Sequence, residues 1–96
     1  MKVVHVDTGR EWRGGQTQLL NLVRARPQDR LVIHPEALLR PTLVAEGIPH
    51  DTVRFRGPVV GAMRLRSLLI RLQPDVVAAH TSHAHSQCLL AGVADR

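Results

Sequence analysis

The sequence predicts an open parallel α/β sheet of four strands with flanking helices, and three observations carry this prediction. Apolar runs at residues 2–6 and 76–79 have the near-continuous hydrophobic character of strands buried on both faces. Strand and helix patterns alternate along the chain, which is typical of right-handed crossovers between parallel strands. Two adjacent glycines, Gly14 and Gly15, separate the first run from a helical pattern. The simplest strand order is 3-2-1-4.

The first half of the chain is predicted to contain two strands joined by a loop and a helix. Residues 2–6 form the first strand, and residues 9–15 form a long polar loop. A helix over residues 16–26 follows, and residues 31–34 form the second strand. Apolar residues at helical spacing mark that helix: Leu19, Leu20, Leu22 and Val23.

The second half repeats the alternation. A short helix is predicted over residues 41–45, a third strand over 50–55, and a long helix over 60–72. Residues 76–79 form a fourth, buried strand, and a last helix covers 84–94. Four leucines form one stripe of the long helix that should face the sheet: Leu65, Leu68, Leu69 and Leu72.

Length and composition describe one small globular domain. The 96 residues are 44% apolar, and no window approaches the roughly 18 apolar residues that a membrane-spanning helix needs. His5 and Asp7 interrupt the first apolar run, which the core of a signal peptide does not tolerate. The single cysteine, Cys88, forbids an internal disulfide and fits a reducing compartment. We therefore expect a cytoplasmic protein.

The charge of the chain is basic and carried by arginine. Net charge is +5, and Lys2 is the one lysine among 13 cationic side chains. Arginine suits anionic partners such as nucleotide diphosphates or phospholipid headgroups, although a GC-rich genome also favours its codons. With no Tyr, one Phe and one Trp, the chain lacks the aromatic platforms on which single-stranded nucleic acids stack. We expect no nucleic-acid partner.

The glycine-paired turn is the candidate ligand site. A strand that enters a helix through glycines aims backbone N–H groups and the positive end of the helix dipole at one point, which favours phosphate. The P-loop pattern fails because Gly15 and Gln16 stand where Lys and a hydroxyl residue are needed, and the GxGxxG pattern fails because no glycine lies between Gly9 and Gly14. The plain alternative is a turn whose glycines only supply backbone angles.

Topology brings a second residue to the same place. Ligands of open parallel sheets bind beyond the carboxyl ends of the strands where the strand order reverses, here between the first and fourth strands. The glycine turn follows the first strand, and His80 follows the fourth. We expect them to meet there.

Two segments resemble the amino-terminal domain of the family-four retaining glycosyltransferases, which have the GT-B fold. DTGREWRGGQTQLL is similar to the first strand–helix loop of that family, and RLRSLLIRLQPDVVAAH is similar to a helix followed by a strand that ends in histidine. The resemblance implies a Rossmann-like sheet and sugar transfer from a nucleotide-sugar donor with retained configuration. It implies no metal and no cofactor, since the nucleotide-sugar is the substrate.

The resemblance also assigns roles to residues. Gly14 and Gly15 would contact the phosphate or sugar of the donor through their backbone. Glu11, Trp12 and Gln16 would face the acceptor, although Trp12 is equally interpreted as a cap on the hydrophobic core.

His80 would be the catalytic residue, with its imidazole near the transferred sugar, where it could donate to a hydroxyl or a phosphate oxygen. The first histidine of the family pattern is replaced by Ala78. A histidine that only caps the strand is the alternative.

The resemblance further implies that residues 1–96 are a truncated amino-terminal domain. The carboxyl-terminal domain with paired glutamates that grips the nucleotide would be missing, so the fragment alone would be inactive. The acceptor would be a saccharide or a lipid-linked sugar of bacterial cell-envelope glycan synthesis, with peripheral contact at the inner membrane left open. An exposed fourth strand predicts a homodimer through the open sheet edge.

Other classes of function stay open at this point. His80, His83, His85 and Cys88 are candidate zinc ligands, but a strand end and a helix are not expected to converge on one ion. Ser82 lacks the turn of a hydrolase nucleophile. A stand-alone flavodoxin-like module that binds phosphate or a nucleotide without catalysis is the main alternative to the transferase.

Overall fold

The computed structural model of the chain describes residues 2–11, 14–54, 58–80, 84 and 88. In this part of the chain the strands and helices strictly alternate. They are β1 (Val3–Asp7), α1 (Gly14–Ala25), β2 (Arg30–Ile33), α2 (Arg40–Ala45), β3 (Asp51–Thr52), α3 (Pro58–Leu72) and β4 (Val76–Ala79). None of the described helices is long and apolar enough to cross a membrane.

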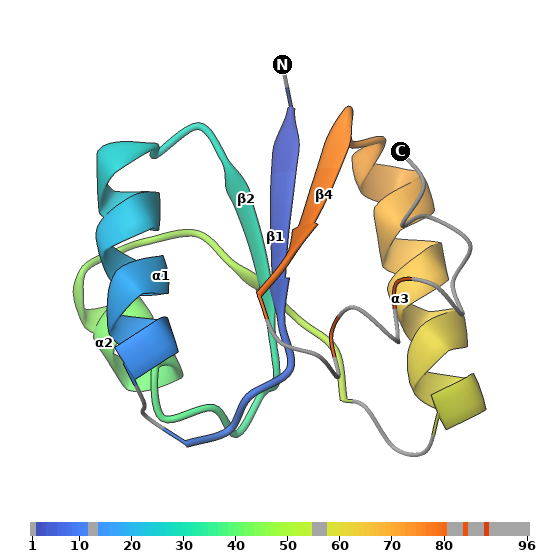
Figure 1. Ribbon diagram of the computed structural model, residues 1–96, viewed down its shortest axis with the longest axis horizontal. Helices are drawn as coiled ribbons and strands as arrows, with labels where there is room; N and C mark the ends of the chain where they lie inside the picture. Colours follow the sequence, from blue (N-terminus) through green and yellow to red (C-terminus); the bar gives the residue numbers. More distant parts are fainter. Residues whose placement is uncertain (1, 12–13, 55–57, 81–83, 85–87, 89–96) are drawn as a thin grey trace.

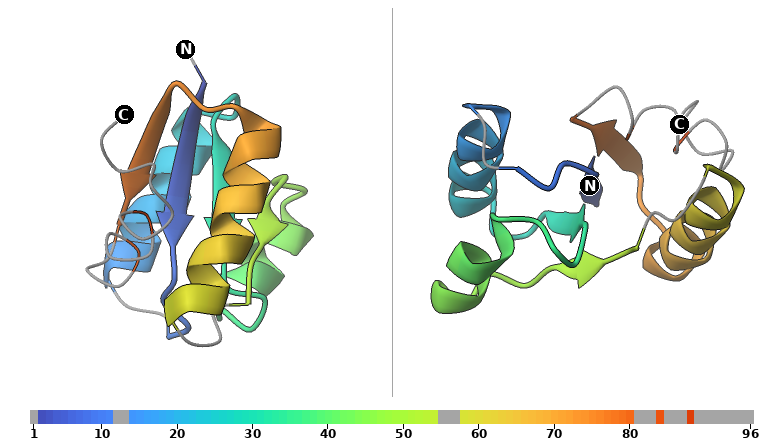
Figure 2. Two further views of the ribbon diagram at one scale, coloured as in Figure 1. Left: turned by 90° about the vertical axis from the view of Figure 1, so that its right-hand side faces the viewer. Right: turned by 90° about the horizontal axis from the view of Figure 1, so that it is seen from below.

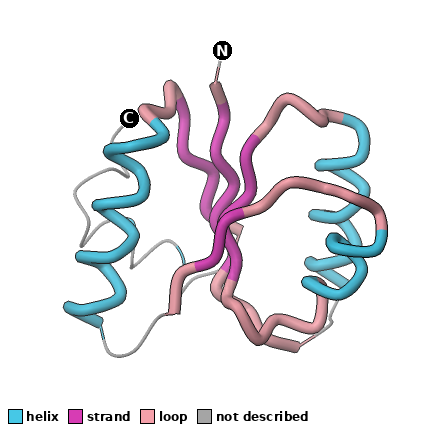
Figure 3. Tube along the Cα trace, turned by 180° about the vertical axis from the view of Figure 1, so that it is seen from behind, coloured by secondary structure: helices cyan, strands magenta, loops and turns pink. Residues whose placement is uncertain are grey.

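The four strands form one parallel sheet in the order β3-β2-β1-β4, which confirms the predicted order. Figure 1 shows α1 and α2 on one face of this sheet and α3 on the other, and the view from below in Figure 2 shows the same three layers. Seen from behind, in Figure 3, the strands run between the two helical layers. Because all strands are parallel, their carboxyl ends lie at the same edge of the sheet, which we call the carboxyl edge. Helices α1 and α3 both begin at this edge (Figure 1).

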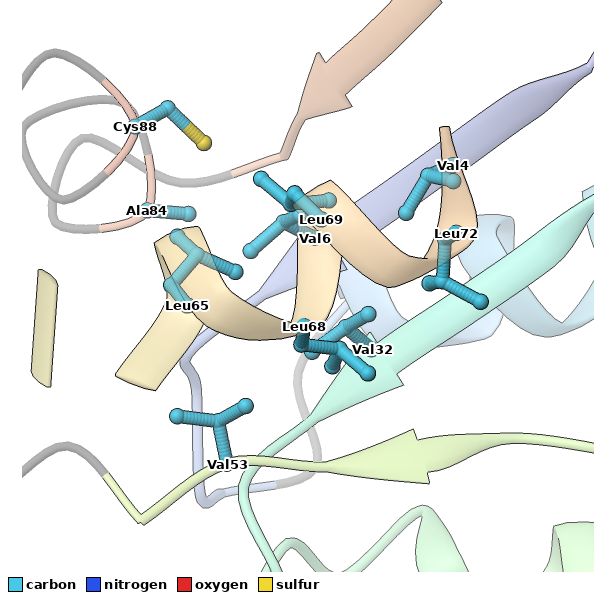
Figure 4. Packing of buried hydrophobic residues seen from close by; sticks show 10 residues of the cluster. All are labelled: Val4, Val6, Val32, Val53, Leu65, Leu68, Leu69, Leu72, Ala84 and Cys88. Atoms are coloured by element: carbon cyan, nitrogen blue, oxygen red, sulfur yellow. The ribbon is translucent and has the colours of Figure 1, made fainter. Parts of the chain in front are cut away.

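Each face of the sheet has its own hydrophobic core. On the α3 face, the predicted leucine stripe packs against alternate residues of β1, as Figure 4 shows for Val4, Val6 and Leu69. The stripe is buried as predicted: Leu65, Leu68, Leu69 and Leu72 are 0–9% exposed. On the other face, residues of α1, of α2 and of the segment between β2 and α2 pack on β2 in a second cluster: Leu19, Leu20, Val23, Leu31, Ile33, Ala37, Leu39 and Leu43.

The alternation along β1 decides where its polar residues go. Val4 and Val6 belong to the core under α3, so the intervening His5 points to the opposite face. His5 and Asp7 are nevertheless buried, since β1 lies between two strands and is covered on both sides. The central strand therefore carries two buried polar side chains that need partners inside the protein.

Several predicted boundaries were wrong. The third strand was expected over residues 50–55, but β3 has two residues, which pair with Val32 and Ile33 of β2. Val53 adds one further N–H bond to the Ile33 carbonyl at 3.0 Å. α3 begins two residues early, at Pro58, which is suited to the first helical position because its missing N–H would have no helical partner. The predicted helix over 84–94 lies outside the described residues, apart from Ala84 and Cys88.

Two predictions of burial also need correction. The fourth strand was expected to be buried, but β4 is half-buried along its length, since among the described strands it pairs only with β1. On α1 the buried side includes Leu20, while Leu22 is half-buried. The helix is rotated so that Leu19, Leu20 and Val23 face the sheet.

Candidate functional site

The carboxyl ends of β1 and β4 form the candidate site. The backbone N–H of His80 donates to the Val6 carbonyl at 3.0 Å, so the residue after β4 stays attached to the end of β1. α1 begins at Gly14 at the same edge of the sheet (Figure 1). The structure thus brings the glycine pair and His80 to one edge. Gly14 and Gly15 lie in the first turn of α1 and not in the preceding loop, so their N–H groups belong to the unbonded end of the helix.

A hydrogen-bonded turn supports the loop between β1 and α1. The buried Asp7 carboxylate accepts the N–H of Gly9 at 2.7 Å, and the Gln16 amide donates to the Gly9 carbonyl at 3.0 Å. A Cβ on Gly9 would lie 3.0 Å from Asp7 Oδ1 and 3.1 Å from Gln16 Nε2, closer than real Cβ contacts normally are. A side chain at this position would require Asp7 or Gln16 to shift by a few tenths of an ångström.

Gln16 is therefore part of the turn's scaffold. The residue is 5% exposed, and its Oε1 is buried without a hydrogen-bond partner. An unpaired buried acceptor is costly, so the loop holds one hydrogen-bonding group that the protein itself does not satisfy. Glu11, by contrast, is exposed, and Trp12 lies outside the described residues.

A polar cluster joins the loop to the end of β2. The Arg10 guanidinium donates to the Glu36 carboxylate at 2.8 Å, and the backbone carbonyl of Arg10 accepts the N–H of Leu38 at 2.9 Å. Arg54 donates to the same Glu36 carboxylate at 3.3 Å, and this hydrogen bond, together with the charge of Arg10, lowers the pKa of Glu36. Burial, assisted by the nearby charge of Arg10, lowers the pKa of His34. Sequence analysis did not single out these residues, because nothing in their spacing links them.

A line of four hydrogen-bonded side chains, Arg26, Asp29, His5 and His80, lies behind the site. His5 Nε2 lies 2.8 Å from Asp29 Oδ2, and His5 Nδ1 lies 2.9 Å from Nε2 of His80. Arg26 Nε donates to the same Asp29 oxygen at 2.7 Å. The Asp29 side chain is fully buried and that of His5 is 6% exposed. The line runs from solvent at Arg26, under α1, to His80 at the carboxyl edge.

Charge and burial set the protonation of this line. The hydrogen bond from Arg26 is the main cause that lowers the pKa of Asp29, burial opposes it, and the bond from His5 adds to the lowering. Asp29 is thus a carboxylate at neutral pH. Although His80 is an exposed residue, desolvation of its ring lowers its pKa, the neighbouring His5 lowers it further, and the nearby Asp7 raises it. His80 is therefore mainly neutral at pH 7.

Sequence reasoning found His80 but not its two inner partners. His5 attracted attention only as an interruption of an apolar run, and Asp29 was not singled out. A lone histidine in the most apolar strand of the chain was the available signal, since a buried imidazole must find hydrogen-bond partners. Which partners it finds depends on residues 24 and 75 positions away.

The candidate zinc ligands are not brought together in the described part of the chain. No group of three or more His, Cys, Asp or Glu side chains there could hold a metal ion. Cys88 is buried against the α3 core, and burial raises the pKa of its thiol. His83, His85 and Ser82 lie outside the described residues.

The comparisons with known proteins add a fold relative. No protein-family model matches the chain, and no curated protein matches it. Among solved structures, the chain is similar to the crystal structure of Anabaena Alr3699/HepE in complex with UDP, with a TM-score of 0.72 and 18% sequence identity. The match covers 100% of this chain and 28% of that one. At this identity the likeness shows the fold: the chain has the open, parallel, Rossmann-like sheet of part of a protein that was crystallised with UDP.

Proposed function

We propose that the chain is the amino-terminal part of a family-four retaining glycosyltransferase of the GT-B fold. The observation that carries this proposal is the placement of the glycine start of α1 and of His80 at one edge of the sheet. They flank the position between β1 and β4 where the strand order reverses. A fold relative bound to UDP supports a nucleotide as the ligand.

Different parts of the site contact the nucleotide-sugar donor and the acceptor. The first turn of α1 offers N–H groups and about half a positive charge, and without a Cβ at Gly14 and Gly15 a diphosphate can approach the backbone closely. His80 contacts the transferred sugar. Glu11, Trp12 and the free Oε1 of Gln16 bind the saccharide or lipid-linked acceptor. No metal or cofactor takes part.

The proposal extends to the parent protein. Residues 1–96 are a truncated domain that works with a carboxyl-terminal domain carrying the paired glutamates. The parent is a cytoplasmic bacterial enzyme of cell-envelope glycan synthesis. The β4 edge pairs with a following strand of the same domain or with a second copy, and a monomeric mass of residues 1–96 by solution scattering contradicts the homodimer.

The first test is the reading frame beyond Arg96. A second α/β domain with paired glutamates supports the transferase. A frame that stops, in a protein that still binds UDP, replaces the transferase with a stand-alone nucleotide-binding module of flavodoxin-like architecture.

The second test is a pair of variants in one helix. Gly15→Leu adds a side chain at the proposed phosphate contact, and Ala25→Leu adds similar bulk at the exposed, opposite end of α1. Leucine favours a helix at least as well as glycine, so the first variant should stay folded. UDP affinity of the full-length protein, measured by calorimetry, should fall about tenfold or more, about 1.4 kcal/mol, in Gly15→Leu only. Equal affinity in the two variants contradicts the site.

A further inference from the structure

The two ring nitrogens of His5 have different partners, and this difference fixes the direction of the hydrogen bonds. Asp29 is a carboxylate that already accepts from Arg26, so it can only accept from His5 Nε2. In the neutral imidazole the other nitrogen is then a lone pair, so His5 Nδ1 accepts the Nε2–H of His80 across 2.9 Å.

The same reasoning determines the tautomer of His80. If Nε2 of the neutral ring carries the proton, Nδ1 is a lone pair. Among the described residues Nδ1 of His80 has no hydrogen-bond partner.

We infer that Asp29 and His5 are positioning residues that hold His80 as the Nε2–H tautomer and leave its Nδ1 as an acceptor for a hydroxyl group of the bound sugar. This inference rests on the proposed function for the identity of the ligand, but the tautomer does not depend on it. It reverses the expectation that His80 donates to its ligand. A doubly protonated His5 would invert the pattern, since it would donate to Nε2 of His80 and place the proton on Nδ1.

The tautomer can be measured without any activity assay. In full-length protein labelled with ¹⁵N-histidine, NMR at neutral pH should show Nε2 protonated in both His5 and His80 and Nδ1 unprotonated in both. A slowly exchanging Nε2 proton on His80 is also expected, because it is held in a hydrogen bond to a buried ring. A protonated Nδ1 on His80 overturns the inference, whether or not the protein transfers sugar.

Two variants of His5 separate positioning from packing. His5→Gln keeps a donor for Asp29 and an acceptor for His80, whereas His5→Leu keeps neither. The slowly exchanging His80 proton should persist in His5→Gln and disappear in His5→Leu, and His50→Gln, which alters a histidine outside the line, should leave it unchanged. A proton that persists in folded His5→Leu overturns the inference. If His5→Leu does not fold, the NMR measurement of the His80 tautomer in the wild-type protein still tests the inference.

Sugar transfer by the full-length protein provides the functional readout. Loss of an orienting partner of a functional histidine costs about 10- to 100-fold at metal sites, and we expect about tenfold in kcat for His5→Leu with recovery in His5→Gln. Normal kcat in folded His5→Leu contradicts a positioning role. Absence of transfer in the wild type, with the expected tautomer present, contradicts the proposed function alone.

Discussion

Gly9→Ala tests whether the turn between β1 and α1 is as tightly closed as its contacts indicate. The new methyl would lie 3.0 Å from Asp7 Oδ1 and 3.1 Å from Gln16 Nε2, so one of these side chains must move. Gln16 is the easier to displace, because its Nε2 is the far end of a flexible side chain and its bond to the Gly9 carbonyl, at 3.0 Å, is longer than the 2.7 Å bond to Asp7.

The expected change in the free energy of unfolding follows from the loss of the hydrogen bond between Gln16 and Gly9. Losing that bond costs about 0.5–1.5 kcal/mol if the displaced amide reaches water, or about 1–3 kcal/mol if it stays buried without a partner. Against this, replacing glycine by alanine at a compatible backbone stabilises by about 0.4–1 kcal/mol through the unfolded chain. Among the glycines that the structure describes, only Gly47 has a positive φ. The backbone of Gly9 is therefore compatible with alanine. The free energy of unfolding should fall by about 1–2 kcal/mol.

Urea denaturation followed by circular dichroism measures this directly, with the midpoint lowered by about 1 M at an ordinary slope. Gln16→Ala is the matched background, since it removes the group that the methyl displaces. In that background Gly9→Ala should cost about 1 kcal/mol less, which a double-mutant cycle reports as coupling. A Gly9→Ala protein that is more stable than the wild type refutes the closed turn.

Two further predictions concern the core and the response to acid. Leu69→Ala removes a side chain that is 2% exposed under the sheet and should lower the free energy of unfolding by about 2–5 kcal/mol in the same urea assay; Met63→Ala, on the exposed side of α3, should change it by less than about 0.5 kcal/mol. The pKa values of His34, Asp29 and His80 are all lowered in the folded state, so the unfolded chain binds more protons in acid. Stability should therefore fall as pH decreases, first below about 6.5 through the histidines and again below about 3.8 through Asp29; thermal melts between pH 7 and 3 that show constant or rising stability contradict these shifts.

The sequence by itself determined the architecture, because the architecture depends on local and periodic information. Apolar runs mark β1 and β4, the leucine stripe orients α3, and the alternation of elements leaves few right-handed arrangements of a parallel sheet. Those same rules place the residue after a strand at the carboxyl edge, which is why His80 and the glycine pair could be brought together in advance.

The tertiary structure alone decided which polar side chains meet. Whether His5 contacts Asp29 and His80 depends on strand register, on the covering of one face by α1, and on rotamers, none of which leaves a periodic trace in the sequence. The shortness of β3 has the same origin, since it depends on pairing with β2. The inward turn of Gln16 is decided more locally, by its bond to Gly9 seven residues earlier, but this contact also leaves no periodic trace in the sequence. Hydrophobic periodicity specifies which way an element faces, whereas hydrogen-bond partners are selected only when the faces are packed together.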